Sequence, residues 1–168
     1  MRKIIFITGP SGVGKTTVTK HLQSRLASKA SFYFFDTIEI PSVKEMISKY
    51  GSQENFQKDA TQRWLDRLIT SKDNLMFFEG QYNPEFINFT KLVKHNIEYK
   101  LICIFADRKI REERLIHLRS QPELANQDME NWQNALIAKT ELLNGICLNS
   151  SEKTVEEIAK VIENEVLK

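Results

Sequence analysis

The feature that most constrains this 168-residue chain is a glycine-rich octapeptide near its start, GPSGVGKT at residues 9–16. An apolar run at residues 3–8 leads into it, and Val18, Leu22 and Leu26 follow at the four-residue spacing of one helix face. The octapeptide fits the pattern G-x-x-x-x-G-K-[ST], which binds phosphate where it connects a strand to a helix. This stretch therefore predicts a strand, a phosphate-binding loop and a helix in direct succession.

The residue types of the loop suit the phosphate chain of a nucleotide. Glycines allow backbone conformations in which successive N–H groups point at phosphate oxygens, and the helix N-terminus adds its positive dipole. Lys15 can reach the β- and γ-phosphates, and the Thr16 hydroxyl can bind Mg²⁺. The sequence lacks the Asn-Lys-x-Asp signature of GTPases, so ATP is the expected nucleotide. The residues expected to contact it are Gly9, Ser11, Gly12, Val13, Gly14, Lys15, Thr16 and Thr17.

Five short runs of apolar, β-branched and aromatic residues predict strands. They are continuous rather than alternating, as expected for strands that helices cover on both faces, and helical patterns separate them. We therefore predict an α/β fold, a three-layer α/β/α arrangement around a five-stranded parallel sheet. The five runs are residues 3–8, 31–35, 75–78, 99–105 and 146–148.

Apolar spacing and capping signals predict the helices between these strands. Apolar residues within 43–50 recur at i, i+3, i+4 and i+7, which places one apolar stripe against the sheet or a neighbour. A serine or threonine followed three residues later by glutamate, a capping box, marks helix starts at Ser42 and Thr154. Further helical patterns cover residues 56–68, 86–93, 108–119, 128–143 and 154–167.

Composition places the chain among globular proteins and favours one domain over residues 1–168. Basic and acidic residues are interleaved and the net charge is only +2, so we expect neither a nucleic-acid nor a membrane partner. The apolar runs are too short for a signal peptide or for the roughly 20 residues of a membrane helix, which makes the cytoplasm the expected location. Cys103 and Cys147 lie in apolar stretches and are expected to be buried thiols.

In its loop and its layout the chain resembles the P-loop kinases of small molecules, a group that contains nucleoside monophosphate, shikimate and gluconate kinases. The wording Gly-Pro-Ser-Gly-Val-Gly-Lys is also that of guanylate kinases, but the Arg- and Tyr-containing segment that those enzymes place after the first helix is absent. The resemblance implies acceptor-binding helices in residues 36–70 and a lid-like segment in residues 108–127. Candidate acceptor contacts in the first segment, unless they are simply solvated, are Tyr50, Gln53, Arg63 and Arg67.

Two acidic residues stand at the ends of predicted strands, at the sheet edge where open α/β sheets bind ligands. Asp36 is a candidate base for an acceptor hydroxyl or a ligand of a magnesium-bound water, and the alternative is a turn or cap residue. Glu79 occupies the place where P-loop proteins carry an acidic residue that acts on Mg²⁺, so we expect it to act with Thr16 at the metal. Gln81 and Tyr82 are candidates for hydrogen bonds to the acceptor, or part of an ordinary turn.

Arginines cluster after the fourth predicted strand, in the lid-like segment. A mobile segment with arginines can close over the transferring phosphoryl group and neutralise its charge. Glu112 and Glu113 lie within helical reach and could pair with these arginines on a plain surface instead. The cluster consists of Arg108, Arg111, Arg114 and Arg119. By analogy of position the last two join the predicted catalytic set, which is Lys15, Asp36, Glu79, Arg114 and Arg119.

These features predict an enzyme, a P-loop kinase that transfers the γ-phosphoryl group of Mg-ATP to a small acceptor and acts as a monomer or homodimer. A nucleoside, a nucleoside monophosphate and a sugar-like metabolite all fit as the acceptor. The alternative is a regulatory P-loop ATPase or nucleotide-binding switch without a small-molecule acceptor. A polynucleotide 5′-kinase is disfavoured by the near-neutral charge and the lack of a basic stripe.

Overall fold

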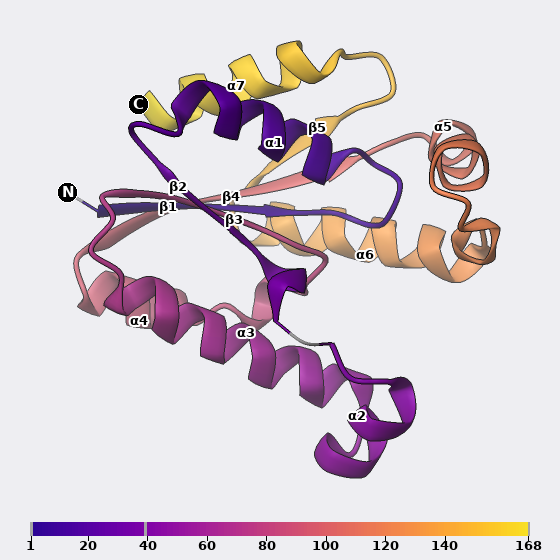
Figure 1. Ribbon diagram of the computed structural model, residues 1–168, viewed down its shortest axis with the longest axis horizontal. Helices are drawn as coiled ribbons and strands as arrows, with labels where there is room; N and C mark the ends of the chain where they lie inside the picture. The colour runs from indigo at the N-terminus through magenta and orange to yellow at the C-terminus, as the bar shows by residue number, and fades with distance from the viewer. Residues whose placement is uncertain (1, 39, 168) are drawn as a thin grey trace.

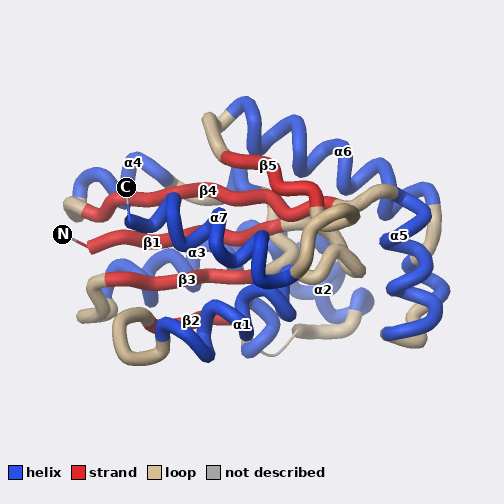
Figure 2. The backbone as a smooth tube through the Cα atoms, turned by 90° about the horizontal axis from the view of Figure 1, so that it is seen from above, coloured by secondary structure: helices blue, strands red, loops and turns tan. Residues whose placement is uncertain are grey.

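The computed structural model describes residues 2–38 and 40–167. Its strands form one five-stranded sheet in the order β2-β3-β1-β4-β5, and every pair of neighbours is parallel (Figure 2). The predicted parallel sheet is therefore confirmed. The strands are β1 (Arg2–Thr8), β2 (Ser31–Phe34), β3 (Leu75–Glu79), β4 (Ile97–Phe105) and β5 (Ile146–Asn149).

Helices cover both faces of this sheet, which confirms the predicted three layers. Figure 1 shows α1 and α7 on one face and α3, α4 and α6 on the other, while α2 and α5 lie beyond the end of the sheet where the strands terminate. The helices are α1 (Lys15–Leu26), α2 (Val43–Tyr50), α3 (Gln53–Thr70), α4 (Phe89–Lys94), α5 (Arg108–Glu113), α6 (Gln127–Leu142) and α7 (Val155–Leu167).

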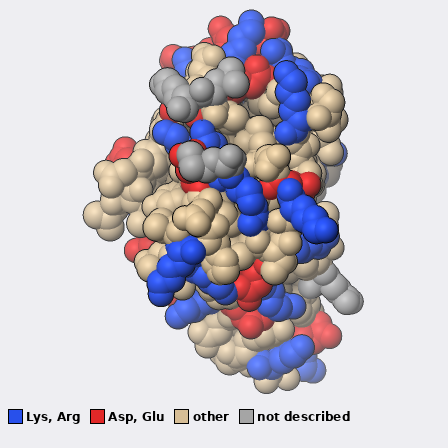
Figure 3. Space-filling model, turned by 90° about the vertical axis from the view of Figure 1, so that its left-hand side faces the viewer, with Lys and Arg blue, Asp and Glu red and all other residues tan. Residues whose placement is uncertain are grey.

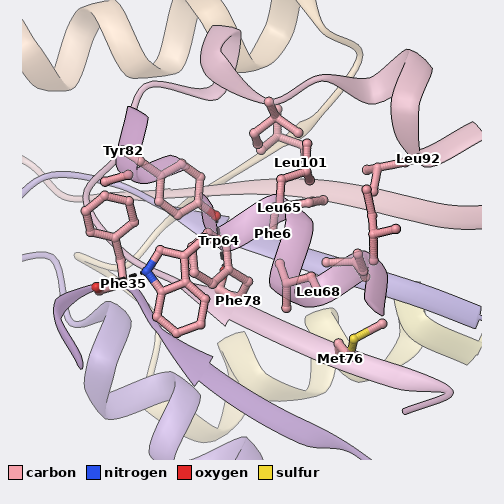
Figure 4. Close-up of a cluster of buried hydrophobic side chains, with 14 of the residues drawn as sticks. Phe6, Phe35, Trp64, Leu65, Leu68, Met76, Phe78, Tyr82, Leu92 and Leu101 are labelled. Carbon is pink, nitrogen blue, oxygen red and sulfur yellow. Dashed lines mark hydrogen bonds between the residues drawn. The ribbon is translucent and has the colours of Figure 1, made fainter. Parts of the chain in front are cut away.

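Successive residues of each central strand enter two hydrophobic clusters, one on each face. In β1, Ile5 and Ile7 belong to the cluster with α1 and α7, whereas Ile4 and Phe6 belong to the cluster with α3 and α4. Figure 4 shows the second cluster, in which Trp64 of α3 lies near the ring of Phe78. Burying each such side chain stabilises the fold by about 1.5–3 kcal/mol. A strand covered on both faces buries every side chain, so its sequence is a continuous apolar run.

The helix predicted over residues 86–93 is confirmed only from residue 89 on, and its predicted start is wrong, because two short helical pieces replace one helix. The 3₁₀ turn η2 (Pro84–Phe86) begins after Asn83, and α4 begins only after Asn88. Each asparagine side chain accepts a hydrogen bond from a backbone N–H of the piece that follows, so each starts a new helical segment. Val93, an apolar residue within the predicted helical pattern, is 62% exposed.

Helix α2 has the predicted bounds, but its predicted apolar stripe is mostly uncovered. Ser42 and Glu45 form the capping box, so the helix starts where the sequence indicates. Val43 is 50% and Ile47 is 55% exposed, whereas Met46 is buried. The stripe is uncovered because α2 lies beyond the sheet and packs mainly against α3 (Figure 1).

The two cysteines lie on neighbouring strands of the sheet. Cys103 is buried as predicted, whereas Cys147 on the neighbouring strand is only half-buried, and both are free thiols. Figure 3 shows basic and acidic side chains interspersed on the face at the amino ends of the central strands. Among the described residues, no helix has both the length and the apolar character needed to cross a membrane.

Candidate active site

The phosphate loop follows β1 at the carboxyl edge of the sheet, and its glycines have conformations that other residues rarely adopt. Gly9, Gly12 and Gly14 have φ angles of 147°, 85° and 91°. A Cβ on Gly9 would lie 2.1 Å from the Ile104 carbonyl oxygen of β4, and one on Gly12 would lie 2.8 Å from Leu115 Cγ. A Cβ on Gly14 would have no atom within 4 Å, so this glycine leaves its backbone accessible from the open side of the loop.

Lys15, Thr16 and Glu79 lie together at the start of α1 and the end of β3. Lys15 Nζ donates to the Pro10 carbonyl at 2.8 Å, and Thr16 Oγ1 donates to Glu79 Oε2 at 3.3 Å. Burial lowers the pKa of Lys15 and raises the pKa of Glu79, while the attraction between the two charges opposes both changes. Hydroxyl and carboxylate oxygens at this spacing are hard ligands that suit Mg²⁺.

Asp36 lies beside this group on the 3₁₀ turn η1 (Phe35–Thr37). Trp64 Nε1 donates to the Phe35 carbonyl at 3.2 Å, which anchors the turn (Figure 4). A Cβ on Gly80 would lie 2.3 Å from Phe35 Cβ, so only glycine allows the turn to approach the end of β3 this closely. The Asp36 side chain is exposed and its charge acts on both Lys15 and Glu79. It makes no hydrogen bond to another described residue, so its carboxylate is available to a ligand.

The segment after β4 forms the opposite wall of a cleft of about 350 Å³ above the phosphate loop. Helix α5 continues directly into a π-helical turn, η3 (Arg114–Leu118). Arg119 is exposed, and its positive charge acts on Lys15 and Glu79. The cleft is lined by Gly12, Gly14, Lys15, Thr16, Thr17, Arg114, Leu118 and Arg119.

Arg114 fixes this segment to the phosphate loop. Its Nη1 and Nη2 donate to Ser150 Oγ at 3.0 Å and to the Ser150 carbonyl at 2.9 Å. Ser150 Oγ in turn donates to the Val13 carbonyl at 2.8 Å. One arginine thus connects η3, the loop after β5 and the phosphate loop.

Several other candidates from the sequence have different surroundings. Tyr82 is fully buried and its hydroxyl donates to the Phe78 carbonyl at 3.1 Å, so its side chain lies in the core. Arg67 lies over the Trp64 ring with 4.8 Å between Cζ and the ring centroid. Arg63 forms an exposed ion pair with Asp59. The structure does not bring these three side chains into the cleft above the phosphate loop.

Sequence reasoning assigned one residue near the site to the wrong surroundings and did not identify another. Arg111, counted among the lid arginines, is fully buried and pairs with Glu130 of α6 at 2.7 Å. Gln57 of α3 donates from Nε2 to the Gln81 carbonyl at 3.1 Å and accepts at Oε1 from the Asn83 N–H at 3.0 Å. These pairs join residues 19 or more positions apart, so no local pattern could have indicated them.

Comparison with known families agrees with this geometry. The family model described as "AAA domain" matches residues 5–133, most of the chain. The chain belongs to the AAA domain family. No curated protein sequence matches this family member closely enough to count as a relative.

Solved structures share the fold of this AAA domain protein at low sequence identity. Shikimate kinase from Acinetobacter baumannii in complex with shikimate has a TM-score of 0.65 and 18% identity over 99% of this chain and 93% of the other. A gluconokinase from Sinorhizobium meliloti has a TM-score of 0.66 and 15% identity over 95% and 90%. Deoxyadenosine kinase from M. mycoides has a TM-score of 0.65 and 14% identity over 97% and 98%. The chain therefore has the fold of the P-loop kinases of small molecules, as predicted.

Proposed function

We propose that this protein transfers the γ-phosphoryl group of Mg-ATP to a small-molecule acceptor. One observation carries the proposal. Lys15, the Thr16–Glu79 pair and Asp36, whose carboxylate makes no hydrogen bond to another described residue, lie at one edge of the sheet, with Arg119 across the cleft. Phosphoryl transfer needs positioned positive charge and a proton acceptor in one place, and this group supplies both.

The donor nucleotide fits the loop and the hollow next to it. Backbone N–H groups of the loop, with Lys15, would hold the phosphates. A second hollow of about 250 Å³ adjoins the cleft and shares with it Gly14, Thr17, Arg114 and Leu118. Its other walls are mainly the side chains of α1, α7 and the loop after β5, which suit an uncharged base; among them are Val18, Ser150, Lys153, Val155 and Ile158.

The chain also offers the ligands for a metal and for the acceptor proton. Mg²⁺, when bound, supplies positive charge at the phosphates, and the Thr16 hydroxyl and the Glu79 carboxylate fit it as inner or water-mediated ligands. For a hydroxyl acceptor, Asp36 would take the proton as the acceptor oxygen bonds to the γ-phosphorus. The bond from that phosphorus to the β,γ-bridging oxygen breaks, and ADP leaves.

The segment 108–127 would act as the lid of this site. Arg119 is exposed at the cleft and free to reach a phosphate oxygen, whereas Arg114 is held by Ser150 and Val13. We therefore assign Arg119 to stabilising the transferring phosphoryl group, and Arg114 mainly to positioning the base of the lid against the phosphate loop. The corresponding acceptor segment is residues 36–70, of which residue 39 lies outside the described residues.

The test is ADP release from Mg-ATP in the presence of single nucleosides, nucleoside monophosphates, shikimate and gluconate, with Lys15→Ala as the blank. We expect release that depends on one class of acceptor and is absent from the blank. Release at the same rate without any acceptor would overturn the proposal and support the regulatory ATPase instead.

A further inference from the structure

A separate hollow lies on the acceptor side, between helices that share one face of the sheet. Figure 1 shows α3 and α6 on the same face of the sheet. The hollow opens between the first turns of α3, the turn η2 and helix α6. Its volume of about 510 Å³ falls in the range of small-molecule sites. We call it the α3–α6 cleft; its walls include Gln53, Gln57, Phe86 and Trp132.

Hydrogen bonds connect the α3–α6 cleft to the phosphate loop. Ser11 Oγ donates to Gln81 Oε1 at 2.9 Å, and Gln57 donates from the cleft wall to the Gln81 carbonyl at 3.1 Å. Gln81 therefore accepts hydrogen bonds both from the phosphate loop and from the cleft wall. A molecule in this cleft would lie on the acceptor side of the phosphate loop.

The α3–α6 cleft offers no free positive charge to an anionic group. Lys139, the basic residue that lines it, pairs with Glu85 at 2.7 Å, and Glu54 adds a carboxylate. Arg63 and Arg67 of α3 are engaged elsewhere, with Asp59 and with aromatic rings. A carboxylate or phosphate in the cleft would therefore be desolvated without a partner, which is costly.

The same cleft suits an uncharged planar ring. Phe86 and Trp132 are both half-buried, so each presents part of an aromatic face. Trp132 Nε1 is a buried donor without a hydrogen-bond partner among the described residues. The Gln53 amide is exposed and makes no hydrogen bond to another described residue, so it can both donate and accept. Ring stacking with a few amide contacts is how proteins hold a nucleobase.

We propose that the acceptor is a nucleoside or a nucleoside monophosphate whose base occupies the α3–α6 cleft. This inference rests on the proposed phosphotransfer and narrows its acceptor. The base would stack on Phe86 or Trp132, and the group to be phosphorylated would extend past Gln81 toward Asp36 and Lys15. Sugar acids such as shikimate and gluconate are disfavoured, because their carboxylate finds no free cation here.

Binding can be tested without turnover by tryptophan fluorescence in the presence of Mg-ADP. The chain has two tryptophans, and Trp64 is buried at 3% exposure, so a ligand in the cleft acts on Trp132. We expect saturable quenching by adenosine, cytidine, guanosine or thymidine, and none by shikimate or gluconate. Quenching by the sugar acids but by none of the nucleosides would overturn the inference.

Kinetics of two variants at one position test the role of the ring. Trp132→Ala is expected to raise the acceptor KM about tenfold or more, with an intermediate effect for Trp132→Phe, which keeps a ring but loses the N–H. The KM for ATP should stay within about twofold in both variants. Leu142→Ala, an exposed position on the same helix, is the matched control. An unchanged acceptor KM in Trp132→Ala, or preferred phosphorylation of a sugar acid, would overturn the inference. Acceptor-independent hydrolysis together with saturable nucleoside quenching would overturn the proposed phosphotransfer and with it the role of the nucleoside as acceptor, but not the base site in the α3–α6 cleft.

Discussion

The donor and acceptor sides of the candidate active site differ in how many contacts hold them in place. On the donor side, Val13, Arg114 and Ser150 are joined by hydrogen bonds from three segments, and Gly12 packs under Leu115. On the acceptor side, α2 leaves Val43 and Ile47 exposed, and Asp36 makes no hydrogen bond to another described residue. This difference fits the proposed function, in which a preformed phosphate loop would lie beside a region that the acceptor completes.

This comparison also separates two ways of building a site. In the proposed function the donor side would use backbone N–H groups, whose positions follow from three glycines within one short loop, residues 9–16. The acceptor side uses side chains from α3, η2 and α6, which meet only in the folded protein. Substitutions on the donor side should therefore affect nucleotide binding and phosphoryl transfer to every acceptor tested, whereas those on the acceptor side should affect the kinetics of particular acceptors.

The largest effect is expected from Lys15→Ala on the donor side. Removing the buried ammonium should lower kcat/KM for phosphoryl transfer by about 10³-fold, because it removes the positive charge that lies in the phosphate loop next to Glu79. Steady-state kinetics with circular dichroism checks this and confirms folding. Lys20→Ala, on the exposed side of the same helix, should keep full activity; equal losses in both variants would contradict the assignment.

On the acceptor side, Asp36→Asn should lower turnover by about 10²-fold when the acceptor group is a hydroxyl. A phosphate acceptor is already ionised and needs no strong base, so turnover should then change little. The measurement compares kcat for a nucleoside and for its monophosphate. Asp59→Asn, an exposed aspartate on α3, is the control. Normal turnover of Asp36→Asn with a hydroxyl acceptor would rule out Asp36 as the base.

Two glycine substitutions should separate packing from ligand access within the donor side. Gly9→Ala places a Cβ 2.1 Å from the Ile104 carbonyl and should lower the free energy of unfolding by about 3 kcal/mol. Gly14→Ala meets no protein atom and should cost only about 1–2 kcal/mol for its positive φ, while weakening nucleotide binding. Urea unfolding and ADP titration check both; tight ADP binding by Gly14→Ala would show that the open side of the loop does not face the phosphates.

The smallest effect concerns the pH dependence of stability. Burial raises the pKa of Glu79 above its ordinary value of 4.5, so the folded state binds this proton more tightly than the unfolded state. The resulting stability is fully present below pH 4.5 and is lost as the pH rises through the raised pKa. Urea unfolding across this window should show the decline in wild type and in Glu98→Gln, an exposed control, but not in Glu79→Gln. A decline that persists in Glu79→Gln must come from another group.

The sequence predicted the sheet and the strand-loop-helix connection around residues 9–16, and the reasons are local. Continuous apolar runs such as the one at residues 3–8 must be covered on both faces, and only a strand-loop-helix connection fits residues 9–16. Asp36 and Glu79 were placed at the sheet edge by the strand ends that precede them. The parallel sheet follows from the same alternation of strand and helix.

The acceptor side could not be predicted in the same way. Gln57 and Trp132 meet at one cleft although 75 residues separate them, as the numbering shows. The helical spacing in residues 43–50 is real, but periodicity does not tell whether a partner surface exists. For Arg111, spacing alone did not distinguish a lid arginine from one buried against Glu130.

The most direct measurement follows the terminal phosphoryl group itself. The protein is incubated with Mg-ATP whose γ-phosphoryl carries ¹⁸O, together with a nucleoside or nucleoside monophosphate, and the products are resolved by mass spectrometry. Our account predicts that the label appears in the phosphorylated acceptor and that Lys15→Ala yields none. Label found only in inorganic phosphate, at a rate independent of every acceptor, would contradict it.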